Sequence, residues 1–189
     1  MLCYQRAGNV ADVALMNTRR LTASDAAAFH QLRMEAVVDT PTSFLKNLEE
    51  SAATPLLEIA ATFNGPHASA VFGTFADDAL VAVIGLRQEA FAKRQHLASI
   101  WGVYTQPAFR RRGLSRELLR HALNRARDNS GIVAVLLHVN PANLAAKSLY
   151  LSCGFMAIGN QPMSLRVDGA FVAEELMMLT LPDKPGSIR

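Results

Sequence analysis

The chain of 189 residues contains only two cysteines, Cys3 and Cys153, and a single tryptophan. Two cysteines cannot build a disulfide framework, which excludes the class of small disulfide-stabilised secreted proteins. The five histidines and two cysteines show no metal-ligand spacing, so we predict no metal site. Low cysteine content is typical of proteins in a reducing cytosol, and we expect a cytoplasmic protein.

Long hydrophobic runs are also missing. The most continuous apolar segment, 132–139, contains His138 and is too short to span a bilayer, so we expect no membrane association. The N-terminus lacks the order of charged and then apolar residues that marks a secretory signal. Residues 1–16 show little periodicity and are predicted to be a flexible extension, with 17–182 a single domain and 183–189 a C-terminal tail.

Neither sign of charge is in large excess, because the net charge at pH 7 is +3 and 19% of the residues are charged. The hydrophobic fraction of 50% is sufficient for one buried core. Arginines are concentrated between residues 110 and 127, so the positive potential is local. Aromatic residues do not alternate with them on a basic face, and we therefore expect a small polyanion as the ligand and no nucleic acid.

Hydrophobic periodicity and capping signals predict strands and helices along the chain. A strand at 17–21, a helix from 22 to about 38, a short helix at 43–51 and a proline-led segment at 54–63 come first. Strands at 68–76, 79–89 and 96–105, a helix at 113–129, a strand at 132–139, a helix at 143–154 and two strands within 155–181 follow. We predict an α/β fold of order β-α-α-β-β-β-α-β-α-β-β, around a central mixed, mostly antiparallel sheet.

The stretch Thr105–Ser115, TQPAFRRRGLS, is predicted to leave a strand, turn through Pro107 and open a helix at Gly113. Glycine lets the main chain approach a ligand closely, and the first helical turn leaves its N–H groups unpaired. Arg110–Arg112 add positive charge where the helix dipole already favours an anion, so the pattern indicates a pyrophosphate site. The lysine and earlier glycine of a nucleotide P-loop are missing, and so are the further glycines of a dinucleotide-binding fingerprint.

A second motif follows the next predicted strand: Asn143-x-x-Ala146-x-x-Leu149-Tyr150-x-x-x-Gly154-Phe155. Together with the arginine turn, it makes the chain resemble the GNAT superfamily of acyl-CoA-dependent N-acyltransferases. The family's loop is glutamine or arginine, two residues, glycine, one residue, then glycine or alanine. Arg110 and Gly113 match it, and Ser115 departs from it by a hydroxyl group. The resemblance is specific within 96–155 and implies acetyl-CoA as the acyl donor.

The resemblance implies roles for the residues that match. Main-chain groups of Val103, Tyr104 and Thr105 are expected to bind the pantetheine arm, and one N–H polarises the thioester carbonyl. The pyrophosphate is expected to lie against Arg110, Arg111, Arg112, Gly113, Leu114 and Ser115. Asn143 is implied to bind the coenzyme, although capping a helix suits it equally well. Tyr150 is implied to contact the coenzyme and to be the general acid that protonates the departing thiolate.

The general base has several candidates. Many family members carry a glutamate where this chain has Ser99, which cannot act as a base unaided. His138 stands on the neighbouring strand, where members resembling the acetylases of ribosomal-protein N-termini have a catalytic glutamate. Histidine exchanges a proton near neutral pH, so His138 is the preferred base. His96 or an ordered water are alternatives, and a hydrogen-bonded core histidine is the structural explanation for His138.

The acceptor site is the least defined part of the sequence. The acceptor is expected to be an amine on a small molecule, or the N-terminus or a lysine of a peptide or protein. Trp101 can wall the site, and Glu89, Glu174 or Glu175 can attract a cationic amine, although such acids are also common at strand ends. Cys153 has no histidine and aspartate arranged to activate it and is expected to serve packing.

We therefore expect an enzyme that transfers an acetyl group from acetyl-CoA to a primary amine, by direct attack in a ternary complex. The missing strand glutamate keeps an alternative open, a catalytically silent acyl-CoA-binding sensor or interaction module. A homodimer through the C-terminal strands is implied by the family resemblance alone.

Overall fold

The computed structural model describes residues 15–63, 65, 68–129 and 131–181. The predicted extension and tail, 1–16 and 183–189, lie outside this part except for Leu15 and Met16. The sequence pattern places Met16 in the extension, but it is the first residue of strand β1, where it pairs with Ala76. Within the described ranges, no helix is long and apolar enough to cross a membrane.

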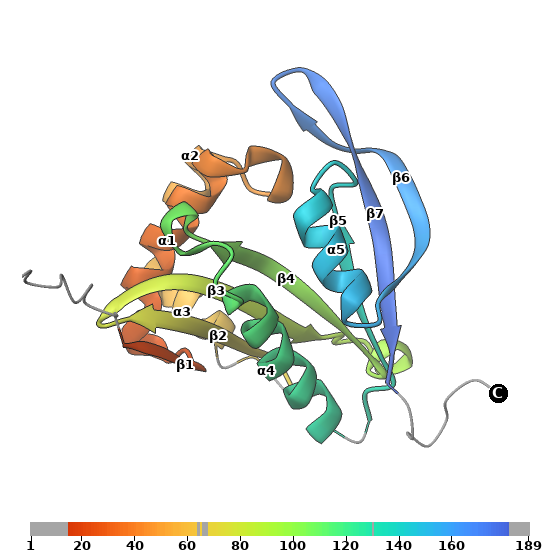
Figure 1. The fold of residues 1–189 in the computed structure, drawn as a ribbon, viewed down its shortest axis with the longest axis horizontal. Coiled ribbons are helices and arrows are strands. Elements are labelled where there is room, and N and C mark those ends of the chain that lie inside the picture. The colour runs from red at the N-terminus through yellow and green to blue at the C-terminus, as the bar shows by residue number, and fades with distance from the viewer. Residues whose placement is uncertain (1–14, 64, 66–67, 130, 182–189) are drawn as a thin grey trace, which may run out of the picture.

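The strands form one seven-stranded sheet in the order β1-β2-β3-β4-β5-β7-β6 (Figure 1). Neighbours are antiparallel except β4 and β5, which confirms the mixed, mostly antiparallel sheet. The strands are β1 (Met16–Arg20), β2 (Ala70–Ala76), β3 (Ala79–Gln88), β4 (Leu97–Thr105), β5 (Ala134–Val139), β6 (Met156–Val167) and β7 (Ala170–Thr180). The α-helices are α1 (Ala26–Asp39), α2 (Leu48–Ala52), α3 (Leu56–Phe63), α4 (Leu114–Asp128) and α5 (Leu144–Ser152).

Three α-helices, not two, lie between β1 and β2. The proline-led segment forms α3, and the helix expected at 43–51 begins only at Leu48. Pro41–Ser43 form a 3₁₀ turn instead, after which the backbone is extended. Proline suits the first position of such a turn, and the side chain of Asn47 then caps α2.

The start of the first helical segment is held by Asp25. Its carboxylate accepts a hydrogen bond from the N–H of Thr22 at 2.8 Å and two from the guanidinium of Arg19, each at 2.8 Å. These bonds favour the ionised form and lower the pKa of Asp25 to about 2, with the bonds from Arg19 the largest cause. The predicted capping signal at this position therefore also anchors β1 to the helix that follows.

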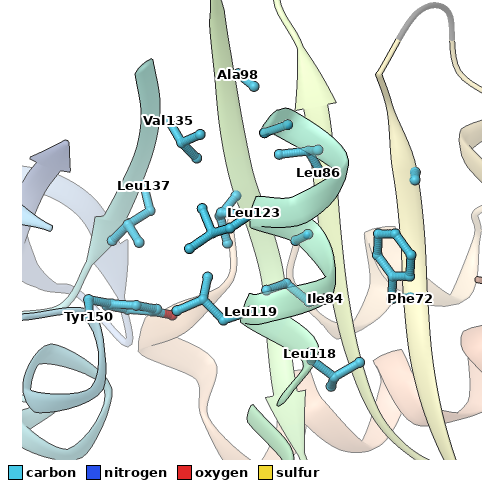
Figure 2. Packing of buried hydrophobic residues seen from close by; sticks show 14 of the residues in the cluster. Phe72, Ile84, Leu86, Ala98, Leu118, Leu119, Leu123, Val135, Leu137 and Tyr150 are labelled. Carbon is cyan, nitrogen blue, oxygen red and sulfur yellow. The ribbon is translucent and has the colours of Figure 1, made fainter. Parts of the chain in front are cut away.

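Each face of the sheet is covered by helices (Figure 1). On one face, Leu118, Leu119 and Leu123 of α4 pack in a cluster with Ile84 and Leu86 of β3, as Figure 2 shows. On the other face, apolar residues of α1 and α3 form a second cluster with residues of β2, β3 and β4. Two covered faces explain why every residue of β2 is buried.

The sheet is interrupted between β4 and β5. These strands pair in parallel only at 97–99 and 134–136, although β4 continues to Thr105 and β5 to Val139. Figure 1 shows the two strands diverging from this common start. The carboxyl half of each strand is thus separated from its neighbour, at the sheet edge where α/β proteins bind ligands.

Candidate active site

A cleft of about 780 Å³ lies where β4 and β5 diverge. It is lined by the ends of both strands, the arginine turn, the first turn of α4 and residues of α5. The predicted site residues that line it are Val103, Tyr104, Thr105, Arg110, Arg111, Gly113, Leu114, Ser115, His138, Asn143 and Tyr150. The fold therefore brings the two sequence motifs to one place.

A β-bulge bends β4 beside the cleft. Val83 of β3 pairs with Tyr104 and Gly85 pairs with Trp101, so β4 has one residue more than β3 between the same two pairings. Within this bulge Gly102 adopts a φ of +62°, which a residue with a side chain rarely tolerates. Bulges bend a strand and increase its twist, which accounts for the departure of β4 from β5.

The arginine turn has two residues in the left-handed region, Arg111 at φ +62° and Gly113 at φ +81°. Gly113 is the N-cap of α4 and has no side chain to offer to the first-turn amides, so those amides are available to a ligand. A Cβ built on Gly113 meets no described atom within 4 Å, which shows that the space in front of the turn is open. The turn has the shape of an anion site.

The three arginine side chains take different positions. The Nε of Arg110 donates to the carbonyl oxygen of Thr105 at 3.0 Å, and its guanidinium forms an ion pair with Asp39 at the end of α1. Arg112 does not line the cleft, because its guanidinium lies 5.1 Å from the centre of a phenylalanine ring in the preceding 3₁₀ turn. Arg111 is exposed and lines the cleft, so it is the arginine best placed to meet an anion.

The second motif places Asn143 and Tyr150 on α5. The Oδ1 of Asn143 accepts a hydrogen bond from the N–H of Ala146 at 3.1 Å, so this side chain caps the helix while lining the cleft. Tyr150 is 5% exposed, and its ring centre lies 5.9 Å from that of Phe155. Figure 2 shows the ring directed from α5 toward α4. Burial raises the pKa of the Tyr150 phenol to about 12, because the phenolate is less well solvated there.

His138 is exposed to the cleft, although it lies in an apolar strand. Its neighbours Leu137 and Val139 are buried, which is the alternation expected when one face of a strand lacks a cover. The structural explanation of a core histidine is therefore wrong. The alternative base, His96, directly precedes β4, at the opposite end of that strand from the cleft.

The acidic candidates differ in their contacts. Glu174 lines the cleft and accepts a hydrogen bond from Ser164 at 2.5 Å. Glu175 pairs with Lys147 at 2.9 Å, and Glu89 accepts a hydrogen bond from the hydroxyl of Ser99 at 3.2 Å. Of these carboxylates, Glu174 alone faces the cleft, so it is the one placed to meet a cationic group there.

Cys153, the residue that follows α5, is partly buried against the core, as expected for a packing residue. Its sulfur lies 3.6 Å from a guanidinium nitrogen of Arg116, and the other terminal nitrogen donates to the hydroxyl of Ser152 at 2.8 Å. Arg116 thereby joins the first turn of α4 to the end of α5.

Sequence reasoning missed the contact between Asp39 and Arg110. An aspartate as the last residue of a helix is unfavourable, because the carboxyl end of a helix already carries partial negative charge. This mismatch was a usable signal for a cationic partner. The identity of that partner depends on how α1 packs against the end of β4.

Comparison with known proteins decides the family. The model of the acetyltransferase (GNAT) family matches residues 31–155, which is more than half of the chain. The chain belongs to the GNAT family. The divergent β4 and β5, the arginine turn, and helix α5 with its cap Asn143 all lie within the matched residues.

Individual relatives agree with this assignment. The ribosomal protein bS18-alanine N-acetyltransferase of Salmonella typhimurium is 39% identical over 72 residues, which are 36% of this chain and 48% of that relative. The match therefore spans about half the length of the relative. A solved GNAT acetyltransferase from Streptococcus pneumoniae has a TM-score of 0.78 at 18% identity, over 88% of this chain and all of that one. The yncA protein of Salmonella typhimurium, solved with its cofactor acetyl-CoA, has a TM-score of 0.77 at 20% identity, over 89% and 95%.

The site fits the coenzyme that this GNAT resemblance implies. A pyrophosphate needs several convergent N–H donors, positive charge and room for close approach. The first-turn amides of α4, the exposed Arg111 and the open space at Gly113 provide these three conditions. The diverging β4 and β5 then provide a cleft that leads from this turn to Tyr150 and His138.

Proposed function

We propose that this protein is an acetyl-CoA-dependent N-acetyltransferase of the cytoplasm. It transfers the acetyl group to a primary amine of a small molecule, peptide or protein, within a ternary complex. The observation that carries the proposal is one cleft that combines a turn with free helix-start amides, a strand separated from its neighbour and the largely buried Tyr150. The names of the relatives support the same reaction class.

The donor half of the cleft is formed by the turn and β4. The amides of Leu114 and Ser115, with Arg111 beside them, hold the pyrophosphate. Main-chain groups of Val103–Thr105, which β5 does not pair with, bind the pantetheine arm. The bound coenzyme supplies an activated thioester. A main-chain N–H aimed at its carbonyl oxygen is worth about 2.7–4 kcal/mol of transition-state stabilisation in comparable sites.

Tyr150 acts as the general acid. In the transfer the amine nitrogen bonds to the acetyl carbon, the carbon–sulfur bond breaks, nitrogen loses one proton and sulfur gains one. Burial keeps the phenol protonated at neutral pH, so Tyr150 is always ready to donate that proton to the sulfur. Its buried ring also fixes the position of the hydroxyl.

His138 receives the proton from the amine, directly or through water. It is exposed in the cleft that also contains Tyr150, and it comes from β5, on the other side of the gap from β4. Because His138 takes the proton from the amine and Tyr150 donates one to the sulfur, the two proton transfers use different side chains. No covalent acyl-enzyme is needed, because holding amine and thioester together itself accelerates the attack.

Two measurements test the proposal. Acetyl-CoA should raise the melting temperature, by a stabilisation of about 2.7 kcal/mol at a hundredfold excess over Kd. Release of the CoA thiol is then followed over a panel of amines, amino acids and peptides. Thiol release that depends on an amine identifies the enzyme, whereas a thermal shift without turnover on any amine identifies the silent coenzyme-binding module.

Two charge-removing variants test whether acetyl-CoA binds at the arginine turn. Arg111→Gln should weaken acetyl-CoA binding, while Arg120→Gln removes the same charge from an exposed position of α4 that does not line the cleft. If both variants weaken binding equally, the effect is one of overall charge and the turn is not the site.

A further inference from the structure

A second cavity of about 400 Å³ lies against the opposite face of the sheet from α4. Residues of α1, α2, α3 and β3 form it, together with Trp101 of β4. Its apolar walls include Phe29, Ile59 and Trp101. Trp101 also lines the coenzyme cleft, so the two cavities share this side chain as a wall at the bulge of β4.

Three buried polar atoms of residues that line this cavity have no hydrogen-bond partner among the described residues. They are Nη1 of Arg33, Nε1 of Trp101 and Oγ of Ser51. Buried polar groups are nearly always paired, because leaving one unpaired costs about 1–3 kcal/mol. Each of the three can donate a hydrogen bond. The Arg33 guanidinium also lies over the ring of Phe44, 4.3 Å from its centre, so its apolar contact is known while its hydrogen-bonding capacity is unused.

The charged side chains that line the cavity also favour a ligand with negative charge. Among the described residues, the one carboxylate that lines the cavity is that of Glu58, which lies 4.0 Å from the ammonium group of Lys46 and is offset by it. Arg33 and Arg87 also line the cavity, and neither forms an ion pair within the described part of the chain. Burial lowers the pKa of the Arg33 guanidinium to about 10, because no anion compensates for its lost hydration. The cavity therefore has an excess of positive charge.

We propose that this cavity binds the acetyl acceptor, and that the acceptor is an amino acid or a similar small amine that carries a carboxylate and an apolar side chain. The proposal rests on the proposed function of the coenzyme cleft. Arg33 and Arg87 bind the carboxylate, Phe29 and Ile59 contact the side chain, and the amine faces Trp101 and the cleft. A carboxylate supplies the acceptor atoms and the negative charge that these residues lack.

The test uses Trp101, the only tryptophan of the chain, as a fluorescent reporter of the cavity. Leucine, methionine and phenylalanine are titrated against the full chain, each beside its carboxamide, which has the same amine and side chain but no carboxylate. We expect the acids to change the tryptophan emission and to bind about tenfold more tightly than the amides. Equal affinities for acid and amide would overturn the proposal.

Substitutions of the two arginines test whether they bind the carboxylate of the amino acid. Arg87→Gln changes an exposed side chain and should reduce the preference for acid over amide to about threefold or less, while Lys93→Gln removes an equal charge outside the cavity and should leave the preference unchanged. Arg33→Met should abolish the preference and also raise the melting temperature, because it removes a largely buried cation that has no anionic partner among the described residues, while methionine keeps an apolar contact with the ring of Phe44. An unaltered preference in both arginine variants would show that the carboxylate binds elsewhere.

The result can be separated from that of the proposed function. A change in tryptophan emission without amine-dependent thiol release would leave the cavity as an amino-acid site and exclude the transferase. Thiol release on C-terminally amidated peptides, with no emission change on free amino acids, would keep the transferase and exclude this acceptor class.

Discussion

The hydroxyl oxygens of Thr105 and Ser115 lie 3.0 Å apart, which joins the last residue of β4 to the first turn of α4. Ser115 stands where the GNAT loop usually has glycine or alanine. The extra hydroxyl does not obstruct the turn, because Thr105 binds it from the side. The departure from the family pattern thus adds a link between the two elements that flank the arginine turn.

Ser115→Ala tests this link. The variant leaves the buried hydroxyl of Thr105 without its partner, so we expect it to lower the free energy of unfolding by about 1 kcal/mol. It restores the family's usual residue, and the Kd for acetyl-CoA should remain within about threefold of wild type. Urea unfolding and a coenzyme titration measure the two quantities. A large loss of affinity without a loss of stability would mean that the serine hydroxyl itself binds the coenzyme.

Gly113→Ala and Arg111→Gly form a pair with opposite effects on the backbone. Both positions have a positive φ, so alanine at 113 adds about 1–2 kcal/mol of strain, and glycine at 111 removes a similar amount. The new Cβ at 113 also projects into the space in front of the turn. We expect Gly113→Ala to be less stable with a raised KM for acetyl-CoA. Arg111→Gly should be more stable, and its KM should rise through the lost charge alone. Unchanged KM values in both would place the pyrophosphate elsewhere.

Tyr150→Phe separates chemistry from binding. Removal of the phenolic proton donor should lower kcat by about a hundredfold and leave the Kd for acetyl-CoA nearly unchanged. Steady-state kinetics and a coenzyme titration give the two values. If kcat falls less than about threefold, another group protonates the thiolate.

The raised pKa of Tyr150 also predicts how stability depends on pH. The buried neutral phenol contributes stability that is complete below about pH 10 and is lost as the pH rises through about 12. Unfolding of the wild type should therefore become easier over this window, by about 2–3 kcal/mol more than that of Tyr150→Phe. Chemical denaturation at several alkaline pH values compares the two proteins. If the free energy of unfolding fell equally with pH in both proteins, the raised pKa of Tyr150 would be contradicted.

His138→Gln tests the base. Glutamine fills a similar volume in an exposed position but cannot act as a base, so kcat should fall and the part of its pH dependence that comes from the base should disappear. His96→Gln serves as the matched control and should keep the wild-type profile. A His138→Gln enzyme with an unaltered pH profile would leave water or another group as the base.

Asp25→Asn tests how much protonation of Asp25 lowers the stability of the protein at low pH. The depressed pKa of Asp25 means that its contribution is present above about pH 4 and is lost as the pH falls through about 2. The variant should have a lower melting temperature at pH 7 and should lose less stability than the wild type on acidification. Thermal scans between pH 7 and pH 2 make the comparison, and identical slopes would exclude this role.

Local signals were sufficient for much of the fold and of the donor site. The glycine at 113, the apolar stripe of α4 and the cap at Asn143 each act within a few residues, so the turn and both helices of the site could be predicted from the sequence. Their arrangement in one cleft followed only from the resemblance to a family. The predicted homodimer stays a prediction.

Features that depend on long-range packing could not be predicted. The neighbours of His138 are apolar and indicated a buried residue, but α1 and α3 pack on β2, β3 and β4 and leave the His138 face of β5 exposed. The cavity beside Trp101 needs α1, α2, α3 and β3 in place, and no short motif marks it. Arg33 lies on a helix face that otherwise packs into the core, and only the structure shows that no anion pairs with it among the described residues.

Helix α1 touches both cavities. Arg33 lines the second cavity, Glu35 accepts a hydrogen bond from Gln106 at 2.6 Å, and Asp39 holds Arg110 of the arginine turn. Arg33 and Asp39 lie about 9 Å apart along the axis of one continuous helix. A ligand that displaces α1 at one end also displaces it at the other, so we expect the binding of the acceptor and of the coenzyme to be thermodynamically linked. Acceptor and coenzyme should then change each other's affinity by the same factor.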